Sequence, residues 1–186
     1  MINHIRRFKR IVTVFAFSIG FSTSVLGQTP ALDDLFNQLR TADSAELEHI
    51  QVRIYEEWSK SGSPLVDLLL RRGQKALTQG DFLLAVKHFS AVIDHAPDFA
   101  EGYNGRATAF YHMQRYGESI EDIRQTLLRN PRHFGAITGL GMIFEELDEP
   151  ERALQAYRRV KALAPAMPNM HEAINRLQKQ LTGQSL

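Results

Sequence analysis

Histidine is the side chain with which this chain could bind a metal or move protons near neutral pH. There are seven histidines, and the closest pair, His88 and His95, lies near Asp94. Three others are isolated: His112, His133 and His171. A zinc site takes three or four ligands at short, regular spacings, and the chain has neither a His-Glu-x-x-His motif nor a comparable cluster. We therefore expect histidines on the surface or between helices, and no metal site.

A run of acids is the second candidate for chemistry: Glu145, Glu146, Asp148, Glu149 and Glu151. It lacks the alternating oxygen ligands and the turn glycine of a calcium loop. Acids are favoured at the positive end of a helix dipole, so the run predicts the start of a helix. The glycines in 102–105 and 135–141 do not follow strands, which excludes phosphate-binding loops, and no serine stands in a nucleophile elbow. The sequence therefore predicts a protein that is not an enzyme, with no catalytic residues and no cofactor.

Composition narrows the class of partner. The chain has no cysteine, which excludes disulfides, thiolate nucleophiles and cysteine-ligated metals. Four cations and no acid lie in residues 1–27, and the remaining 18 cations face 21 acids, so residues 28–186 carry a net charge of about −3. Because nucleic-acid-binding domains usually present a basic face, we expect no nucleic-acid partner.

The stretch from Val66 to Pro165 repeats one pattern three times at a spacing of 34 residues. Four sets of equivalent residues keep this spacing: Pro97, Pro131 and Pro165; Gly73, Ala107 and Gly141; Ala85, Ser119 and Ala153; Phe89, Ile123 and Tyr157. A period of about 34 residues with two amphipathic segments per unit is typical of stacked helical hairpins.

Each copy is predicted to run as helix A, a tight turn and helix B. Helix A is expected at 65–79, 99–113 and 133–147, and helix B at 82–95, 116–129 and 150–163. The prolines follow helix B, because a residue without an N–H cannot continue the helical ladder. Asp98 with Glu101 predicts a capping box at the start of the second helix A. The paired small residues predict a close approach of the A and B axes.

This pattern resembles the tetratricopeptide repeat over residues 66–165, because eight positions per copy keep register without an insertion. Ala76, Ser119 and Pro150 depart from the family's usual residues, and none of them breaks the hairpin pattern. The resemblance implies an all-α fold, a right-handed superhelical stack of helix-turn-helix hairpins. The repeats are then expected at 66–99, 100–133 and 134–167, followed by a capping helix and tail in 168–186, with the helix over Asn169–Leu181.

Residues 28–64 predict a helical hairpin that either caps the first repeat or is a degenerate fourth copy. Asp43 with Glu46 predicts a capping box at its second helix. An apolar stripe at steps of three and four ends at Trp58. Tyr55 and Trp58 are expected in the core, and an exposed aromatic patch for a partner is the alternative.

The first 27 residues predict a signal peptide. Met1–Arg10 is basic, and Ile11–Phe21 is an apolar run about as long as the hydrophobic region of such a peptide. We expect cleavage near Gly27, export of the mature chain and no stable membrane span after cleavage. The compartment is the periplasm if the source is Gram-negative. An uncleaved N-terminal membrane anchor is the alternative.

The resemblance places a candidate binding groove on the concave surface, which the A helices line. The candidate partner-binding residues combine amides, hydroxyls and a few apolar or charged groups: Arg71, Gln74, Asn104, Thr108, Tyr111, Thr138, Met142 and Glu145. Such a mixture suits an extended peptide. A solvated face without a ligand is the alternative.

One kind of groove is not expected. Chaperone-type members of the family clamp a C-terminal carboxylate with lysine, asparagine and arginine. The matching positions here carry no cation: Leu70, Gln74, Gly105, Gly135 and Gly139. Charge-assisted capture of a carboxylate is therefore unsupported. The three glycines predict a close approach of either a neighbouring helix or a partner.

The function expected from the repeat and the signal peptide is that of an exported scaffold that holds a protein or peptide partner. A structural subunit that self-assembles or bridges a cell-envelope complex is the alternative. The sequence fixes neither the partner nor the oligomeric state.

Overall fold

The computed structural model describes residues 30–183, and this part of the chain is helical. The helices are α1 (Pro30–Thr41), α2 (Ser44–Trp58), α3 (Pro64–Thr78), α4 (Phe82–His95), α5 (Ala100–His112), α6 (Tyr116–Arg129), α7 (Phe134–Glu146), α8 (Pro150–Leu163) and α9 (Met170–Gly183). The predicted signal peptide, residues 1–27, lies outside the described residues. Within residues 30–183, no helix has the length and apolar character needed to cross a membrane.

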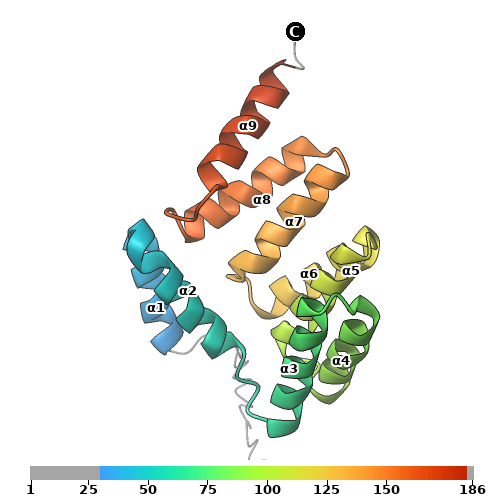
Figure 1. The fold of residues 1–186 in the computed structure, drawn as a ribbon. Coiled ribbons are helices and arrows are strands. Elements are labelled where there is room, and N and C mark those ends of the chain that lie inside the picture. Colours follow the sequence, from blue (N-terminus) through green and yellow to red (C-terminus); the bar gives the residue numbers. More distant parts are fainter. Residues whose placement is uncertain (1–29, 184–186) are drawn as a thin grey trace, which may run out of the picture.

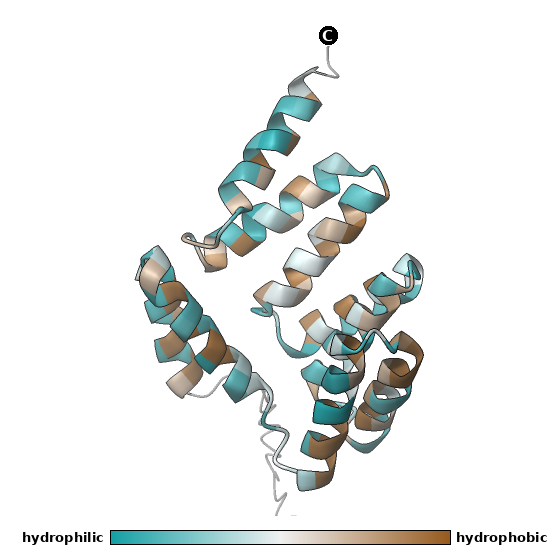
Figure 2. Cartoon of the chain, viewed as in Figure 1, coloured by the Kyte–Doolittle hydropathy of each residue, from teal (hydrophilic) through white to brown (hydrophobic). Residues whose placement is uncertain are grey.

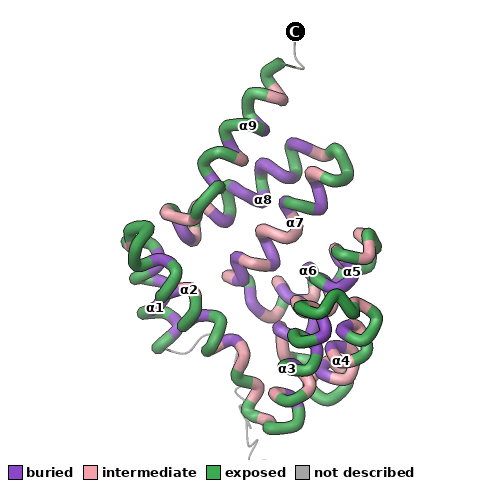
Figure 3. The backbone as a smooth tube through the Cα atoms, viewed as in Figure 1, coloured by how far each residue is buried: buried purple, intermediate pink, exposed green. Residues whose placement is uncertain are grey.

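Helices α3 to α8 form three antiparallel hairpins that stack in sequence order, and α9 packs against α8 (Figure 1). The three B helices have the predicted bounds, and each A helix begins and ends within one residue of its prediction. Buried residues run along α7 and α8 on their facing sides, while α9 is largely hydrophilic (Figures 2 and 3). The prediction of an all-α stack of helical hairpins is confirmed.

The A and B helices of every repeat are joined by the same turn. Its left-handed position is Gly80 in the first repeat (φ 74°), Gln114 in the second (φ 59°) and Asp148 in the third (φ 55°). In the first repeat the amide of Gly80 donates to Leu77 and that of Asp81 donates to Ala76, and the other two turns repeat both bonds. These bonds satisfy the last carbonyls of helix A, as in a Schellman cap.

Aromatic rings pack against the helix backbone at glycines, both within a hairpin and between neighbouring hairpins. A Cβ at Gly73 or at Gly105 would lie 2.6 Å or 2.3 Å from the ring of Phe89. A Cβ at Gly141 would lie 2.4 Å from the ring of Tyr157. These distances are far below van der Waals contact, so the glycines set how closely the helices approach.

The N-terminal hairpin, α1 and α2, forms as predicted but lies elsewhere. The prediction that it caps the first repeat is wrong: α1 packs against α8, and neither helix packs along α3 or α4. Its buried side chains share one apolar core with α7, α8 and α9. Asp43 caps α2 through its carboxylate, which accepts hydrogen bonds from the amides of Ala45 and Glu46.

The predicted capping box at the start of α5 is not formed. Helix α5 follows Phe99, which has no side-chain cap, and Asp98 makes no capping bond. Glu101 instead turns inward, is 7% exposed, and pairs with His133. The Glu101 carboxylate therefore binds a residue that is distant in the sequence instead of capping the start of α5.

Candidate functional site

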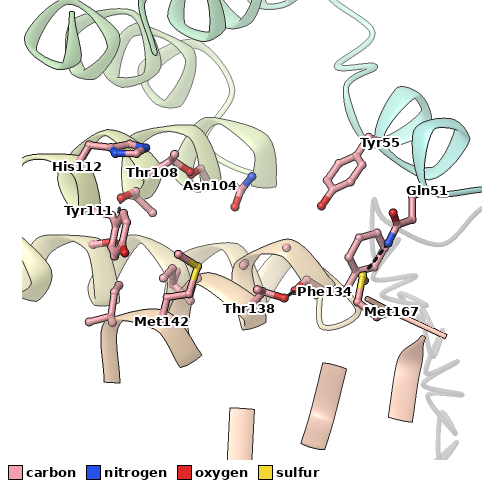
Figure 4. Close-up of a pocket in the computed structure, with 17 residues that line it drawn as sticks. Gln51, Tyr55, Asn104, Thr108, Tyr111, His112, Phe134, Thr138, Met142 and Met167 are labelled. Atoms are coloured by element: carbon pink, nitrogen blue, oxygen red, sulfur yellow. Dashed lines mark hydrogen bonds between the residues drawn. The ribbon is translucent and has the colours of Figure 1, made fainter. Parts of the chain in front are cut away.

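A cavity of about 430 Å³ lies along the A helices of the second and third repeats. Helices α5 and α7 supply most of its walls, α6 contributes Ser119 and Ile123, and α2 covers one side (Figure 4). Its lining is Gln51, Tyr55, Asn104, Ala107, Thr108, Tyr111, His112, Ser119, Ile123, Phe134, Gly135, Ala136, Thr138, Gly139, Met142, Ile143 and Met167. The volume is within the usual range of ligand pockets.

The cavity brings together five of the eight residues predicted for the groove: Asn104, Thr108, Tyr111, Thr138 and Met142. Their spacing places them on one face of α5 or of α7, since residues three and four apart are neighbours on a helix. Arg71 and Gln74 are exposed on α3 and do not line the cavity. The candidate surface is thus concentrated on two of the three repeats.

Glu145, the remaining predicted residue, is engaged by other parts of the chain. Its carboxylate pairs with Arg176 of α9 at 2.6 Å and accepts a hydrogen bond from the Tyr157 hydroxyl at 2.7 Å. Burial opposes its charge, but these two donors outweigh burial and lower the pKa of Glu145. Burial, together with the same contact to Glu145, raises the pKa of Tyr157. Glu145 therefore ties α9 to the third repeat at the end of the cavity.

No aspartate, glutamate, lysine or arginine lines the cavity. Its polar groups are amides, hydroxyls and the imidazole of His112. Two of the hydroxyls donate to their own helix: Thr108 to the Asn104 carbonyl at 3.0 Å and Thr138 to the Phe134 carbonyl at 2.9 Å. Their oxygens remain acceptors. Burial and the charge of Glu146 raise the pKa of Tyr111, so its hydroxyl is neutral at physiological pH. The site favours an uncharged group over an ion.

The sequence did not predict that α2 would form the fourth wall. Gln51 donates to the sulfur of Met167 at 2.9 Å, and Tyr55 directs its hydroxyl into the cavity (Figure 4). Tyr55 is 38% exposed, so neither the core nor the surface-patch prediction describes it fully. Trp58, by contrast, is buried as expected. Only the apolar stripe of α2 hinted that this helix has a docking face.

The three glycines at which a close approach is predicted differ in what lies near them. At Gly105 the approaching group is the buried ring of Phe89, and at Gly135 it is the Tyr55 hydroxyl, 2.6 Å from where a Cβ would stand. At Gly139 the nearest atom would be 3.8 Å away, which is ordinary contact. A neighbouring segment of the same chain therefore explains two of the three.

His133 joins α5, α7 and the hairpin at the edge of the cavity. Its Nδ1 accepts a hydrogen bond from the Ala136 amide at 3.0 Å, which caps α7, so the proton lies on Nε2. Nε2 then donates to Glu101 of α5 at 2.8 Å. The indole of Trp58 stacks on the imidazole at 4.4 Å between centroids. This buried network fixes the relative positions of the cavity walls.

Within the described residues, no group of three or more His, Cys, Asp or Glu side chains is arranged to hold a metal ion. The pair of Glu101 and His133 has its donor and acceptor sites used by the protein itself.

Comparisons with known proteins agree with this geometry. A family model described as tetratricopeptide repeat matches residues 70–122 and 113–168. A TPR repeat-containing protein of Rhizobium etli is 35% identical over 153 residues, which are 82% of this chain and 75% of the relative. The small glutamine-rich tetratricopeptide repeat-containing protein 2 of Saccharomyces cerevisiae is 27% identical over 115 residues, 62% of this chain and 33% of that protein.

Solved structures share the fold at low identity. The first TPR of Spaghetti (RPAP3), bound to the HSP90 peptide SRMEEVD, has a TM-score of 0.61 at 21% identity and covers 64% of this chain and 95% of its own. The TPR2B domain of yeast Sti1 in its pHsp70 complex has a TM-score of 0.58 at 21% identity and covers 63% and 99%. At such identity these likenesses concern the fold alone.

Proposed function

Since the chain belongs to the tetratricopeptide repeat family, we propose that it is a scaffold that holds a segment of a partner protein in the cavity between α5 and α7. The observation that carries this proposal is the lining of that cavity, which combines apolar side chains with amides and hydroxyls on two adjacent A helices. An extended peptide needs both, because its side chains are buried while its backbone must keep hydrogen bonds.

The same lining argues for a partner segment without charge. Some solved neighbours hold peptides such as SRMEEVD, which is acidic. Here no cation lines the cavity, so an acidic segment would lose its hydration without gaining a charge-assisted bond. We therefore propose an uncharged, largely apolar segment as the occupant.

Recovery of the partner from cell-envelope extract tests this function. Asn104→Ala, Tyr111→Ala and Met142→Ala, combined in one chain, are expected to reduce the recovery of the partner at least tenfold. Leu128→Ala is the matched control, because Leu128 is 63% exposed on α6, away from the cavity. Unchanged recovery with the triple variant would remove the cavity from the proposal.

The site of action is part of the proposal. The basic and apolar residues of 1–27 support export and cleavage near Gly27. Fractionation of the source cells, with mass spectrometry of the mature N-terminus, tests it. A cytoplasmic chain that retains Met1–Gly27 would contradict export, and a membrane-bound chain that retains it would favour the uncleaved anchor.

A structural role in an assembly is the second candidate, and one observation favours it. Because the N-terminal hairpin docks on the third repeat, the first repeat leaves four leucines exposed: Leu65 (50%), Leu68 (39%), Leu83 (65%) and Leu84 (39%). Exposed apolar groups of this size are typical of contact surfaces. Light scattering at high concentration tests this role, since a monomer would count against self-assembly.

A further inference from the structure

We propose that the α1–α2 hairpin is a clasp that closes over the partner segment, with the Tyr55 hydroxyl making a hydrogen bond to the bound segment. The inference rests on the proposed function of the cavity and gives α2, which forms its fourth wall, a role in binding. The expected occupant is an uncharged apolar segment in extended form, because neither the repeat helices nor α2 presents a charged side chain to the cavity.

Among the described helices, the hairpin packs less closely on the repeats than neighbouring repeats pack on each other, since only α1 lies closely against a repeat helix, α8. At the start of α7, the ring centroids of Trp58 and Tyr55 lie 5.2 Å and 5.3 Å from that of Phe134, and the Phe36 centroid lies 6.4 Å from it. Arg132 adds a contact over the Phe36 ring at 4.2 Å. A hairpin that meets the repeats mainly through side chains can undock with less disruption than a repeat that packs along its neighbour.

A short connection joins the hairpin to the first repeat. Residues 59–63 connect α2 to α3, and Gly62 has a φ of 78°, which favours glycine. The Ser61 amide and hydroxyl both donate to Asp67 at the start of α3, at 3.0 Å and 2.5 Å. The connection is therefore fixed at the first repeat, while the docking face lies on the third. The hairpin therefore extends from the first repeat to the third.

The hydroxyl of Tyr55 is available to a bound segment. Tyr55 projects its hydroxyl from α2 into the cavity (Figure 4), and within the described residues this hydroxyl makes no hydrogen bond. Its position depends on Gly135, since a Cβ there would lie 2.6 Å from the hydroxyl oxygen. A donor and acceptor held in an apolar cavity is suited to a backbone amide or carbonyl of the bound segment.

Docking of the hairpin is linked to the cavity walls at the start of α7. Phe134, Gly135 and Ala136 at the start of α7 line the cavity, and Phe134 also receives the aromatic anchor of the hairpin. Docking of the hairpin and filling of the cavity therefore act on the same turn of α7. A segment that contacts both α2 and α7 favours the docked position by its differential affinity for it.

Trp58 offers a direct reading of closure because it is the single tryptophan of the chain. Its indole is buried against His133 and Phe134 when the hairpin is docked. Acrylamide quenching of its fluorescence therefore reports the fraction of undocked hairpin.

The experiment uses the full chain and a panel of synthetic dodecapeptides with acetylated and amidated ends. The panel alternates leucine or phenylalanine with serine or asparagine, and matched peptides carry glutamate or lysine at the polar positions. We expect the uncharged peptides to bind and to reduce quenching of Trp58 at least twofold. We expect Tyr55→Phe to weaken binding about 2–10-fold, the worth of one hydrogen bond, without changing the melting temperature of the repeats.

Two further variants separate the clasp from the cavity. Phe36→Ala removes part of the aromatic anchor and does not line the cavity, so it should raise quenching of Trp58 and weaken peptide binding. Met142→Glu places a charge on the cavity wall and should abolish binding with the hairpin still docked. Circular dichroism confirms in each case that the helical content of the repeats is retained.

Each remaining outcome decides against one proposal. Loss of binding in Met142→Glu, with unchanged binding in Tyr55→Phe and Phe36→Ala, would overturn the clasp and leave the proposed function intact. Tighter binding by Phe36→Ala would show that the hairpin competes with the partner, which also overturns the clasp. Unchanged binding in Met142→Glu, or no binding by any peptide, would overturn the proposed function and the clasp with it.

Discussion

His133 illustrates how one side chain can connect three parts of the molecule. Its two ring nitrogens cap α7 and bind Glu101, and its face carries Trp58. A buried polar group satisfied on every side stabilises one arrangement of its neighbours, because any other would leave a donor or acceptor without a partner. His133 and Glu101 therefore specify the arrangement of α5, α7 and the hairpin around the cavity.

Replacing His133 should be costly. His133→Ala leaves the Glu101 carboxylate buried without its donor and removes the cap of α7. We expect a loss of about 2–4 kcal/mol in the free energy of unfolding, measured by urea denaturation. Glu101→Gln is the matched variant: it keeps an acceptor for Nε2 and should lose less. A smaller effect in His133→Ala than in Glu101→Gln would contradict this account of the network.

Ionisation of Tyr55 should lower the free energy of unfolding at alkaline pH. Burial of the phenol, reinforced by the charge of Glu101, raises its pKa to about 12. The folded state therefore holds this proton where the unfolded state, with an ordinary pKa of about 10, releases it. The contribution of Tyr55 is complete below pH 10 and is lost as the pH rises from 10 towards 12.

Unfolding of the wild type and of Tyr55→Phe, compared between pH 9 and pH 11.5, measures this contribution. The free energy of unfolding should fall more steeply with pH in the wild type, because phenylalanine cannot ionise. Parallel profiles for the two proteins would indicate that the Tyr55 hydroxyl is solvated and does not face the cavity.

At the scale of the helices, two equivalent glycines should respond in opposite ways to alanine. Gly105 and Gly139 occupy the same position of successive A helices, where alanine alone would gain about 1 kcal/mol in helix propensity. At Gly105 the added methyl meets the buried ring of Phe89 at 2.3 Å, and such overpacking costs about 1–3 kcal/mol. At Gly139 the nearest atom would be 3.8 Å away.

We therefore expect Gly105→Ala to lower the melting temperature and Gly139→Ala to raise it, by a few degrees each. Thermal unfolding followed by circular dichroism provides the measurement. The same direction of change in both variants would mean that Phe89 relaxes freely, and that the glycine is not what brings α4 and α5 together.

The turn between helices A and B offers a second matched pair. Gln114 occupies the left-handed position that Gly80 occupies one repeat earlier, and this conformation costs a side chain about 1–2 kcal/mol. Gln114→Gly should therefore stabilise the protein by about 1 kcal/mol, and Gly80→Gln should destabilise it by a similar amount. Chemical denaturation of both variants tests this, and a loss of stability in Gln114→Gly would contradict it.

The repeats could be predicted from the sequence, because their signals are local. The prolines and the small residues keep a fixed spacing, and each hairpin buries its neighbour's face in the same way. Five of the eight groove residues line one cavity for the same reason. The spacing of residues along a helix decides which side chains share a face. This spacing does not depend on where the helix is predicted to begin and end.

What the sequence could not give is the arrangement between distant segments. The stripe of α2 shows that it has a docking face but not that Phe134, rather than α3, receives it. Glu101 has the spacing of a capping residue, yet it pairs with His133, 32 residues away. Both outcomes depend on which groups the folded stack brings within reach, and a periodic pattern contains no information about that.

At the scale of the whole molecule, the described part of the chain is a short stack of hairpins with the α1–α2 hairpin beside the cavity of its A helices. One end of the array is covered by α9, while the first repeat keeps exposed leucines. The described part of the chain therefore offers two candidate contact surfaces: a cavity that no aspartate, glutamate, lysine or arginine lines, and an apolar face on the first repeat. They correspond to the two functions under consideration, a scaffold for a partner segment and a subunit of an assembly.

Photo-crosslinking in the native cell tests the central claim most directly. p-Benzoylphenylalanine is placed at Met142 in the cavity or at the exposed Leu128 of α6, and the crosslinked peptides are identified by mass spectrometry. We expect a discrete adduct from Met142 to an uncharged, apolar segment of one partner, and none from Leu128. An adduct from Leu128 alone, or attachment to an acidic segment at Met142, would contradict it.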